Sequence, residues 1–359
     1  MSRDVLELDA PVAKGAKAAE QRELDARVLS VLEQAIKSDE QRAGAAAQLV
    51  RECRHERHRI LGTAREELTA HRHRERESRR RHGVWSDAQR IARQVDFVRE
   101  AQSLGVDTDA IFALNEYERS KIELLTSDRT QGSGGPSFKP GPPGPPPPPG
   151  KSCAISKPPY NGAYYWSWHH LEGESQLLTS TSYFDKPTAT AGGAVRVRNW
   201  DADDSDYSLA YQENGFVTWY KTNQIGAVTV DATFQRLSGT GTIQTENEWG
   251  VSDSWIYANS YIRCGVFHND VSEVTVSQYG IHSIGYSGNG DGYPSPPGGL
   301  YGGGPFTVSF VSTSIFPANT WVGVYVGMRD QVEFWVNDVS VDTTESGKYF
   351  ISGIKVCEF

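Results

Sequence analysis

The sequence predicts a multidomain protein with α and β parts: an N-terminal helical region, a proline-rich linker and a C-terminal all-β antiparallel sandwich, jelly-roll-like. Three observations predict it. Apolar residues recur every three or four positions before residue 130, GPPGPPPPPG follows at 141–150, and apolar residues alternate with polar ones after residue 160. We expect a flexible N-terminus at 1–19, helices at 20–130, the linker at 131–158 and the sandwich at 159–359.

Charge and aromatic residues divide unevenly between the two parts. Positive and negative residues balance in residues 1–130, so the net charge of −9 belongs to the rest of the 359-residue chain. An acidic surface repels nucleic acid and anionic lipid, which makes both poor partners for the second part. Only Trp85 of the nine Trp precedes residue 160, so the second part holds the large side chains that a sizeable core needs.

No targeting segment or membrane span stands out in the sequence. The start, MSRDVLELDAPVAKGAK, has no apolar h-region, and no window approaches the roughly 18 apolar residues of a membrane span. We therefore expect a soluble protein that is made in the cytoplasm without a signal peptide. Export without a cleaved signal stays open.

The helical part carries an apolar stripe at heptad spacing. It begins at Leu24, Val28, Val31 and Ala35, the pattern of a coiled-coil seam. It continues along a helix expected from about residue 40 to 82, through Ala46, Val50, Cys53, Arg57, Ile60 and Ala64. Narrow stripes with small residues need partners, which are either neighbouring helices in the same chain or copies of the protein. We favour copies and predict a homo-oligomer that assembles through this region.

Two further helices are expected before the linker. Ser86 and Gln89 fit a capping box at the start of one helix, which Gly105 ends, and Asp107 or Thr108 can cap the last helix. Between the helices, residues 51–82 are rich in Arg, Glu and His. Interleaved charges at spacings of three and four predict a solvated helix rather than a nucleic-acid patch.

The linker and the strands are read from local composition. A proline run forms a stiff polyproline II rod, about 30 Å long for ten residues, which would hold the sandwich clear of the helices. In the β part, QVEFWVN places Val332, Phe334 and Val336 inward and Glu333, Trp335 and Asn337 outward. AVTVDATF and PFTVSFV alternate in the same way, and turns are expected at SGTGT, SGNGDG, PPGGLYGGGP, VND and ESGK.

Residues 319–343 carry one local resemblance. Trp321 opens a strand, Arg329 and Asp330 form a short turn, and the next strand runs into Asn337 and Asp338. This pattern resembles the strand–turn–strand unit of concanavalin-A-like and laminin-G-like sandwiches. The resemblance implies a sandwich architecture and no particular ligand or reaction.

The four cysteines form no CxxC-type motif, so isolated thiols are the first expectation. Cys153 and Cys357 flank the β part. They can pair only if the two ends of that part meet in an oxidising compartment.

Aromatic side chains are the main candidates for ligand binding. The β part holds more of them than one core requires, and exposed aromatic faces stack on sugar rings or anchor protein interfaces. The predicted ligand-binding residues are Tyr164, Tyr165, Trp166, Trp168, Trp200, Trp249 and Trp255. The neighbouring His169 and His170 point to opposite faces of a strand and make no convincing metal pair.

Two acidic clusters give weaker candidates. Asp201, Asp203, Asp204 and Asp206 offer hard oxygen ligands for Ca²⁺, although a polar turn is the favoured interpretation and no other cofactor is indicated. Glu246 and Glu248 would share one face of a strand, as glycoside hydrolysis requires, but surface carboxylates are favoured there too.

These observations favour a non-enzymatic binding or structural protein. A helical base would assemble copies, and the sandwich would recognise a glycan or protein surface, in a layout like that of fibre and adhesin proteins. One alternative is a carbohydrate-active enzyme that uses Glu246 and Glu248. The other is an intracellular adaptor that docks through the basic helix at 51–82.

Overall fold

The computed structural model describes residues 16–82, 87–126, 153–160, 163–173, 175, 177–185, 187–199, 205–247, 254–268, 275–287, 305–312, 314–337 and 339–358. Its helices are α1 (Ala16–Leu61), α2 (Arg65–His82), α3 (Asp87–Ser103) and α4 (Thr108–Leu125). Its strands are β1 (Cys153–Ser156), β2 (Tyr164–Gly173), β3 (Leu177–Asp185), β4 (Thr190–Asn199), β5 (Ser205–Lys221), β6 (Val228–Asn247), β7 (Trp255–His268), β8 (Thr275–Ser287), β9 (Pro305–Val311), β10 (Trp321–Asn337) and β11 (Val339–Glu358).

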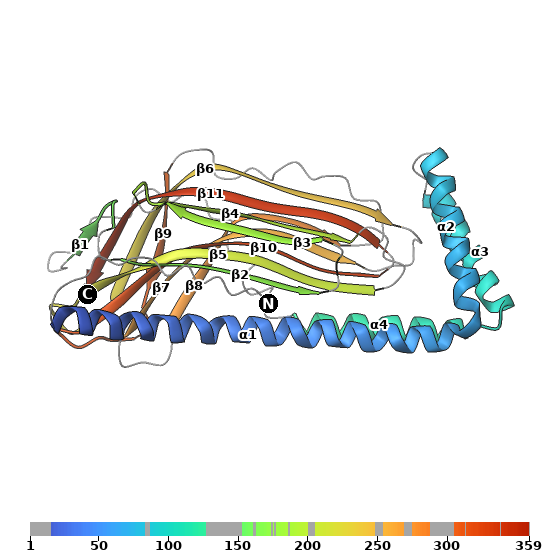
Figure 1. Ribbon diagram of the computed structural model, residues 1–359, viewed down its shortest axis with the longest axis horizontal. Coiled ribbons are helices and arrows are strands. Elements are labelled where there is room, and N and C mark those ends of the chain that lie inside the picture. Colours follow the sequence, from blue (N-terminus) through green and yellow to red (C-terminus); the bar gives the residue numbers. More distant parts are fainter. Residues whose placement is uncertain are drawn as a thin grey trace.

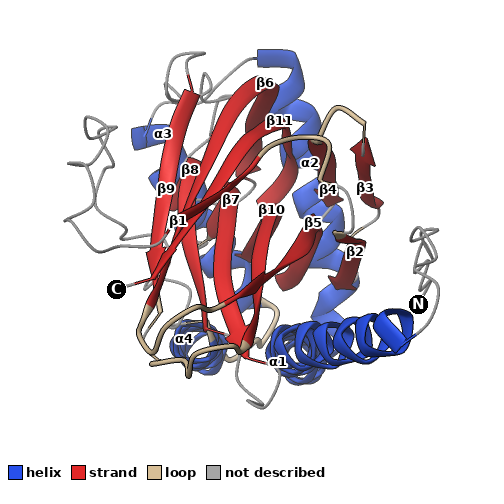
Figure 2. Ribbon diagram, turned by 90° about the vertical axis from the view of Figure 1, so that its left-hand side faces the viewer, coloured by secondary structure: helices blue, strands red, loops and turns tan. Residues whose placement is uncertain are grey.

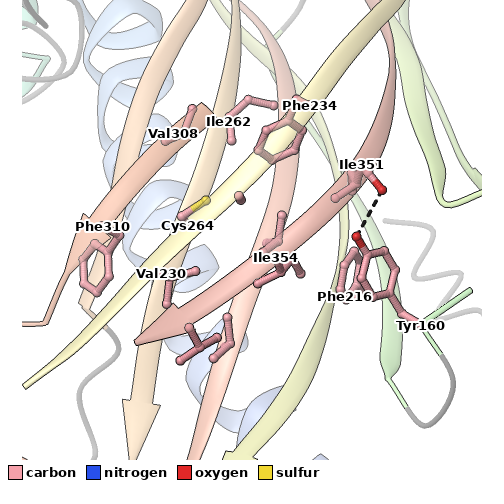
Figure 3. Close-up of a cluster of buried hydrophobic side chains, with 14 of the residues drawn as sticks. Tyr160, Phe216, Val230, Phe234, Ile262, Cys264, Val308, Phe310, Ile351 and Ile354 are labelled. Atoms are coloured by element: carbon pink, nitrogen blue, oxygen red, sulfur yellow. Dashed lines mark hydrogen bonds between the residues drawn. The ribbon is translucent and has the colours of Figure 1, made fainter. Parts of the chain in front are cut away.

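The strands form two packed antiparallel sheets, so the predicted β-sandwich is confirmed (Figures 1 and 2). One sheet has the order β3-β4-β11-β6-β9, with β1 added beside β11. The other, here called the β5–β10 sheet, has the order β2-β5-β10-β7-β8. Figure 3 shows part of the core between the sheets, where the hydroxyl of Tyr160 donates a hydrogen bond to the carbonyl oxygen of Ile351 at 3.1 Å.

Several turns expected from the sequence are wrong. Arg329 and Asp330 lie in the middle of β10, a single strand of 17 residues, so the strand–turn–strand unit behind the concanavalin-A-like resemblance is absent. Likewise β6 runs through residues 238–242 and β11 through 345–348. Strands β10 and β11 pair with both of their neighbours along these stretches and β6 pairs there with β11, so the ladder hydrogen bonds outweigh the local turn preference. At VND, Val336 and Asn337 belong to β10 and β11 begins at Val339 in the other sheet, while Asp338 lies outside the described residues.

A polar layer divides the sandwich core into two apolar clusters. Asp330 of β10 is fully buried within this layer. Its Oδ2 accepts a hydrogen bond from Gln212 at 2.8 Å, and Oγ of Ser260 lies 2.5 Å from its Oδ1 and 2.7 Å from Oε1 of Glu345. Burial raises the pKa of Asp330 to about 7; the carboxylate of Glu345 adds to the rise, and the hydrogen bonds from Ser260 and Gln212 oppose it.

We expect the stability of the sandwich to fall with rising pH because of Asp330. A carboxyl group whose pKa is raised in the folded state stabilises fully below its unfolded pKa of 3.8, and this contribution is lost as the pH rises through about 7. The full loss is roughly 4 kcal/mol, of which roughly 3 kcal/mol falls between pH 5 and pH 8. Urea unfolding of wild type and Asp330→Asn at pH 5 and pH 8 checks this, because the variant should lack this part of the pH dependence. Equal pH slopes in the two proteins would contradict it.

Helices α1 and α4 lie against the sandwich, whereas α2 and α3 extend beyond its end (Figure 1). Figure 1 shows α1 running along the β5–β10 sheet with α4 beside it, and Figure 2 shows both helices beneath the strands. Asp107 caps α4, as expected, by accepting a hydrogen bond from the backbone N–H of Ala110. The predicted long helix from 40 to 82 is interrupted at Gly62, which has a φ of +51°.

The apolar stripe of α1 is used within the chain. Ala46, Val50, Cys53 and Arg57 are buried, and Ala46 and Val50 belong to a cluster with Ile122 of α4 and the aromatic residues of β5 and β10. This half of the predicted seam therefore packs against the protein's own sheet. Self-association through residues 20–37 stays a prediction.

Cys153 and Cys357 form a disulfide, so the first expectation of isolated thiols is wrong for this pair. The two residues lie directly opposite each other in the β1–β11 ladder. Strand β1 therefore belongs to the sandwich, although it falls inside the stretch assigned to the linker. Cys53 and Cys264 are buried free thiols, and burial raises the pKa of Cys53 to about 12.

Candidate ligand-binding face

The outer face of the β5–β10 sheet combines aromatic, charged and amide side chains. Strand alternation turns every second residue of β2, β5, β7 and β10 to this face. The antiparallel register then sets Trp168 opposite Glu213, and His170 opposite Tyr211. The members described on this face are Trp168, His170, Tyr207, Tyr211, Glu213, Trp255, Asn259, Arg263, Tyr325, Arg329, Gln331, Glu333 and Trp335.

Glu213 is the centre of a buried ion network on this face. Its carboxylate accepts hydrogen bonds from Nη1 of Arg263 at 2.6 and 2.7 Å, from Nε of Arg329 at 2.8 Å, and from the hydroxyl of Tyr325. Burial works to raise the pKa of Glu213, but the two guanidinium groups outweigh it and hold that pKa below its usual range. The carboxylate is therefore charged at neutral pH and fixes both arginines in place.

Trp168, His170, Tyr211 and Arg329 form a patch beside this network, which we call the β2–β5 patch. The imidazole of His170 packs on the ring of Tyr211 with centroids 5.4 Å apart, and the guanidinium carbon of Arg329 lies 3.9 Å from the centroid of the same ring. Burial lowers the pKa of His170 to about 4, and the nearby Arg329 works in the same direction while Asp39 opposes it. The imidazole is neutral at pH 7.

Three polar atoms of the β2–β5 patch are buried without a hydrogen-bond partner in the part of the chain that the structure describes. They are Nε1 of Trp168, Nε2 of His170 and the hydroxyl oxygen of Tyr211. Such atoms are rare in native proteins, because leaving a buried donor or acceptor unmet costs about 1–3 kcal/mol. Three of them on adjacent side chains mark a place where a polar ligand would gain hydrogen bonds.

Helix α1 covers the β2–β5 patch. Nη1 of Arg329 donates to Oδ2 of Asp39 at 2.8 Å, and Oε1 of Glu40 lies 3.7 Å from Nδ1 of His170. One turn further along α1, Nη1 of Arg42 donates to Oε1 of Glu333 at 2.7 Å. Two acidic side chains of the helix thus face the cationic and imidazole groups of the patch.

Glu118 of α4 is the second attachment of the helices to the sheet. The side chain is fully buried, and its carboxylate accepts hydrogen bonds from Nη2 of Arg57 at 3.0 Å, from the hydroxyl of Ser205 at 3.1 Å, and from Nε1 of Trp335 at 2.8 Å. Arg57 also donates to the hydroxyl oxygen of Ser205 and to Asn115. This group joins α1, α4, β5 and β10 through one carboxylate.

The aromatic residues predicted as ligand-binding do not share one environment. Trp168 lies on the outer face, half-buried under α1, whereas Tyr165 points into the core and packs on Phe184 and Phe216. Trp255 is buried on the outer face beside Tyr207 and Tyr257. Tyr164 and Trp166 are in β2, but their side chains are outside the described set, as are residues Trp200 and Trp249.

The acidic candidates lie in two places. Asp206 is buried in β5, and its Oδ2 accepts hydrogen bonds from Asn199 at 2.8 Å and from Ser175 at 2.9 Å, while Asp201, Asp203 and Asp204 are outside the described residues. Glu246 pairs with Ser340 near the end of β6, and Glu248 is outside the described residues. Within the described ranges no group of three or more His, Cys, Asp and Glu side chains is placed to hold a metal. The calcium and glycosidase assignments remain predictions.

Sequence reasoning missed three of the four members of the β2–β5 patch. His170 was considered only as a metal ligand, Tyr211 was not singled out, and Arg329 was placed in a turn. The usable signal was strand alternation in SLAYQEN, which sets Tyr211 and Glu213 on one face. The contact between β2 and β5 could not be obtained from that alternation.

No protein family matches this chain, and no curated protein matches it. Among solved structures, it is similar to TmCBM61 in complex with beta-1,4-galactotriose (11% identity, covering 47% of this chain and 89% of the other, TM-score 0.17). It is also similar to the enzymatically active domain of bacteriophage CBA120 tailspike protein 4 (9%, 48% and 19%, 0.16) and to the xylan-binding domain from CBM 22 (11%, 52% and 86%, 0.12). Likeness at these TM-scores assigns neither a family nor a ligand. No helix among the described residues is long and apolar enough to cross a membrane.

Proposed function

We propose that this protein recognises a glycan through the β2–β5 patch of its sandwich, without catalysing a reaction. The observation that carries the proposal is the set of three unpartnered polar atoms on the adjacent side chains of Trp168, His170 and Tyr211. Sugars offer hydroxyl groups as donors and acceptors around an apolar ring face. A patch of aromatic rings that also lacks hydrogen-bond partners is complementary to both properties.

The rigidity of the sheet supports the same proposal. Tyr211 and Arg329 lie on β5 and β10, the two longest-paired strands of the sheet, and Arg329 is held by Glu213 from within the sheet. Side chains fixed in this way lose little conformational entropy when a ligand binds. Nothing in the patch supplies a nucleophile next to a base, so binding alone is proposed.

Replacing Trp168 tests the proposed site. We expect Trp168→Ala to weaken polysaccharide binding at least about ten-fold, because the ring surface and one donor are lost together. The measurement is affinity electrophoresis of the full chain in gels that contain β-1,4-mannan, β-1,4-galactan, xylan or polymannuronate.

Tyr183 provides the matched control. It is an exposed aromatic residue on β3 of the other sheet, so Tyr183→Ala should leave binding unchanged. Loss of binding in Tyr183→Ala with normal binding in Trp168→Ala would move the site to the other sheet. Helix α1 covers the patch, so variants in which α1 is displaced are tested together with the wild-type chain. The proposal is refuted if none of these proteins binds any of the four polymers.

The assembly part of the prediction remains separate from glycan recognition. A fibre- or adhesin-like layout requires copies to associate through the first half of α1, where Leu24, Val28, Val31 and Ala35 form the predicted seam. The second half of α1 is engaged with the protein's own sheet. An oligomer would therefore be joined through residues 20–37 while each patch stays covered by its own helix.

A further inference from the structure

We infer that α1 occupies the β2–β5 patch as an internal mimic of an acidic glycan, and that a saccharide carrying a carboxylate binds there when the helix moves away. The inference rests on the proposed function and adds to it the class of ligand and the way the site is masked. The juxtaposition that carries it is the pair of carboxylates of Asp39 and Glu40 facing Arg329 and His170.

The first argument is the chemistry of the contact. Arg329 donates through Nε to Glu213 within the sheet, and its Nη1 reaches outward to Oδ2 of Asp39 at 2.8 Å. A guanidinium group with one edge held by the protein and another edge offered outward is well suited to a carboxylate ligand. A uronic acid carboxylate could take the place of Asp39 while the sugar ring contacts Trp168 and Tyr211.

The second argument is that the sheet keeps its charges paired when the helix leaves. Arg329 retains Glu213, and Glu333 retains the hydroxyl of Tyr207 at 2.8 Å and Nε2 of Gln331 at 3.2 Å. No charged group of the face is left buried and alone, which is the situation that costs the most. The charged groups Arg329 and Glu333 therefore keep partners within the sheet when α1 is away.

The third argument is the nature of the helix surface. Toward the sheet α1 presents the small side chains of Ala43, Ala46, Ala47 and Val50, so the large rings of this contact (Tyr207, Tyr211 and Trp335) belong to the sheet and stay there when the helix leaves. The side chains of Asp39 and Arg42 are 29% and 21% exposed, so their ion pairs with the sheet are reached by solvent and weakened by salt. Release is opposed by the buried Glu118 group, by the hydrogen bond from Arg54 to the backbone oxygen of Ser205, and by the apolar cluster under α1.

The connection between helices and sandwich allows this movement. Residues 127–152 join the end of α4 to β1, and a stretch of that length reaches at most about 90 Å when extended. The helices can therefore leave the face while remaining tethered to it.

The test uses the full chain with Ala43→Arg as the opening variant. Ala43 is fully buried against the sheet, so a long cationic side chain at this position displaces the helix. Ala45→Arg is the control, because Ala45 is exposed on the same helix and the added charge is identical. Opening is measured by hydrogen–deuterium exchange of the amides of residues 39–57, which should speed up in Ala43→Arg alone.

Binding is then compared for polymannuronate and β-1,4-mannan, which share linkage and ring configuration and differ in the carboxylate. We expect Ala43→Arg to bind polymannuronate at least about ten-fold more tightly than wild type or Ala45→Arg. The reason is that the conformation in which α1 has left the β2–β5 patch is no longer a minor population. Mannan should bind the opened protein more weakly than polymannuronate.

Each other outcome decides a different point. An opened variant that binds both polymers equally overturns the acidic class and leaves glycan recognition standing. An opened variant that binds neither refutes the proposed function as well. An opened variant with the affinity of wild type for polymannuronate overturns the masking by α1.

A second pair of variants guards against misfolding of Ala43→Arg. Glu118→Ala removes the acceptor shared by Arg57, Ser205 and Trp335 and should also release the helices, with the same gain in polymannuronate binding. Glu116→Ala is its control, because Glu116 is exposed and pairs with Arg119 three residues away on the same helix. If Glu118→Ala opens the helix without a gain in binding, the inference fails by this route too.

Discussion

Glu213→Ala is expected to lower the free energy of unfolding of the sandwich by about 3–5 kcal/mol, because it leaves Arg263 buried without a counter-ion. Arg329 loses its sheet partner in the same substitution and keeps only Asp39 of α1. The hydroxyl of Tyr325 also loses its acceptor. Urea unfolding at pH 7, followed by tryptophan fluorescence, measures the loss.

The pH dependence of that loss identifies its origin. A carboxylate with a lowered pKa stabilises the protein above its unfolded value of 4.5, and this contribution disappears as the pH falls through the lowered folded pKa. The gap between wild type and Glu213→Gln should therefore be full at pH 7 and shrink in acid. Exposed Glu116→Ala should cost less than about 0.5 kcal/mol. A Glu213→Ala protein as stable as this control would show that the ion network contributes nothing.

Removing the disulfide is expected to cost about 2–5 kcal/mol. The Cys153–Cys357 bond closes a stretch with a sequence separation of 204 residues, which restricts the unfolded chain strongly. It also fixes the short edge strand β1 to the end of β11. We expect Cys153→Ser to lower the urea midpoint and the thermal midpoint.

The double variant with serine at both positions is the control for this measurement. Reductant should shift the midpoint of wild type to that of the double variant and leave the double variant unchanged. If reductant shifts both proteins equally, the effect belongs to another group. Intact-mass analysis after thiol alkylation counts the free cysteines directly and should show that only Cys53 and Cys264 are reduced.

The sequence by itself determined the two kinds of structure and the local details that depend on spacing. Alternation predicted that Val332, Phe334 and Val336 point inward, and all three are fully buried. The Asp–Thr pair before the last expected helix predicted a cap at Asp107 or Thr108, and Asp107 caps α4. Both rest on the fixed periodicity of strands and helices, which is a property of the chain within a few residues.

Turns were less predictable because tertiary pairing outweighed them. Glycines and charged pairs in SGTGT, ESGK and around Arg329 are typical of turns, yet they lie inside strands of 17 to 20 residues. Arg329 donates hydrogen bonds to Glu213 and Asp39, which are both distant from it in the sequence. A local pattern contains no information on such partners.

The candidate site was decided by tertiary structure alone. Glu333 and Trp335 point away from the core, as alternation predicts, but they are buried because α1 and α4 cover that face. Helical spacing marks a stripe such as Ala43, Ala46 and Val50 as packed without specifying what it packs against. Here the stripe packs against the sheet, because its small side chains fit the aromatic rings of the strands. The carboxylate of Glu118 in α4 adds three hydrogen bonds, which it accepts from α1, β5 and β10.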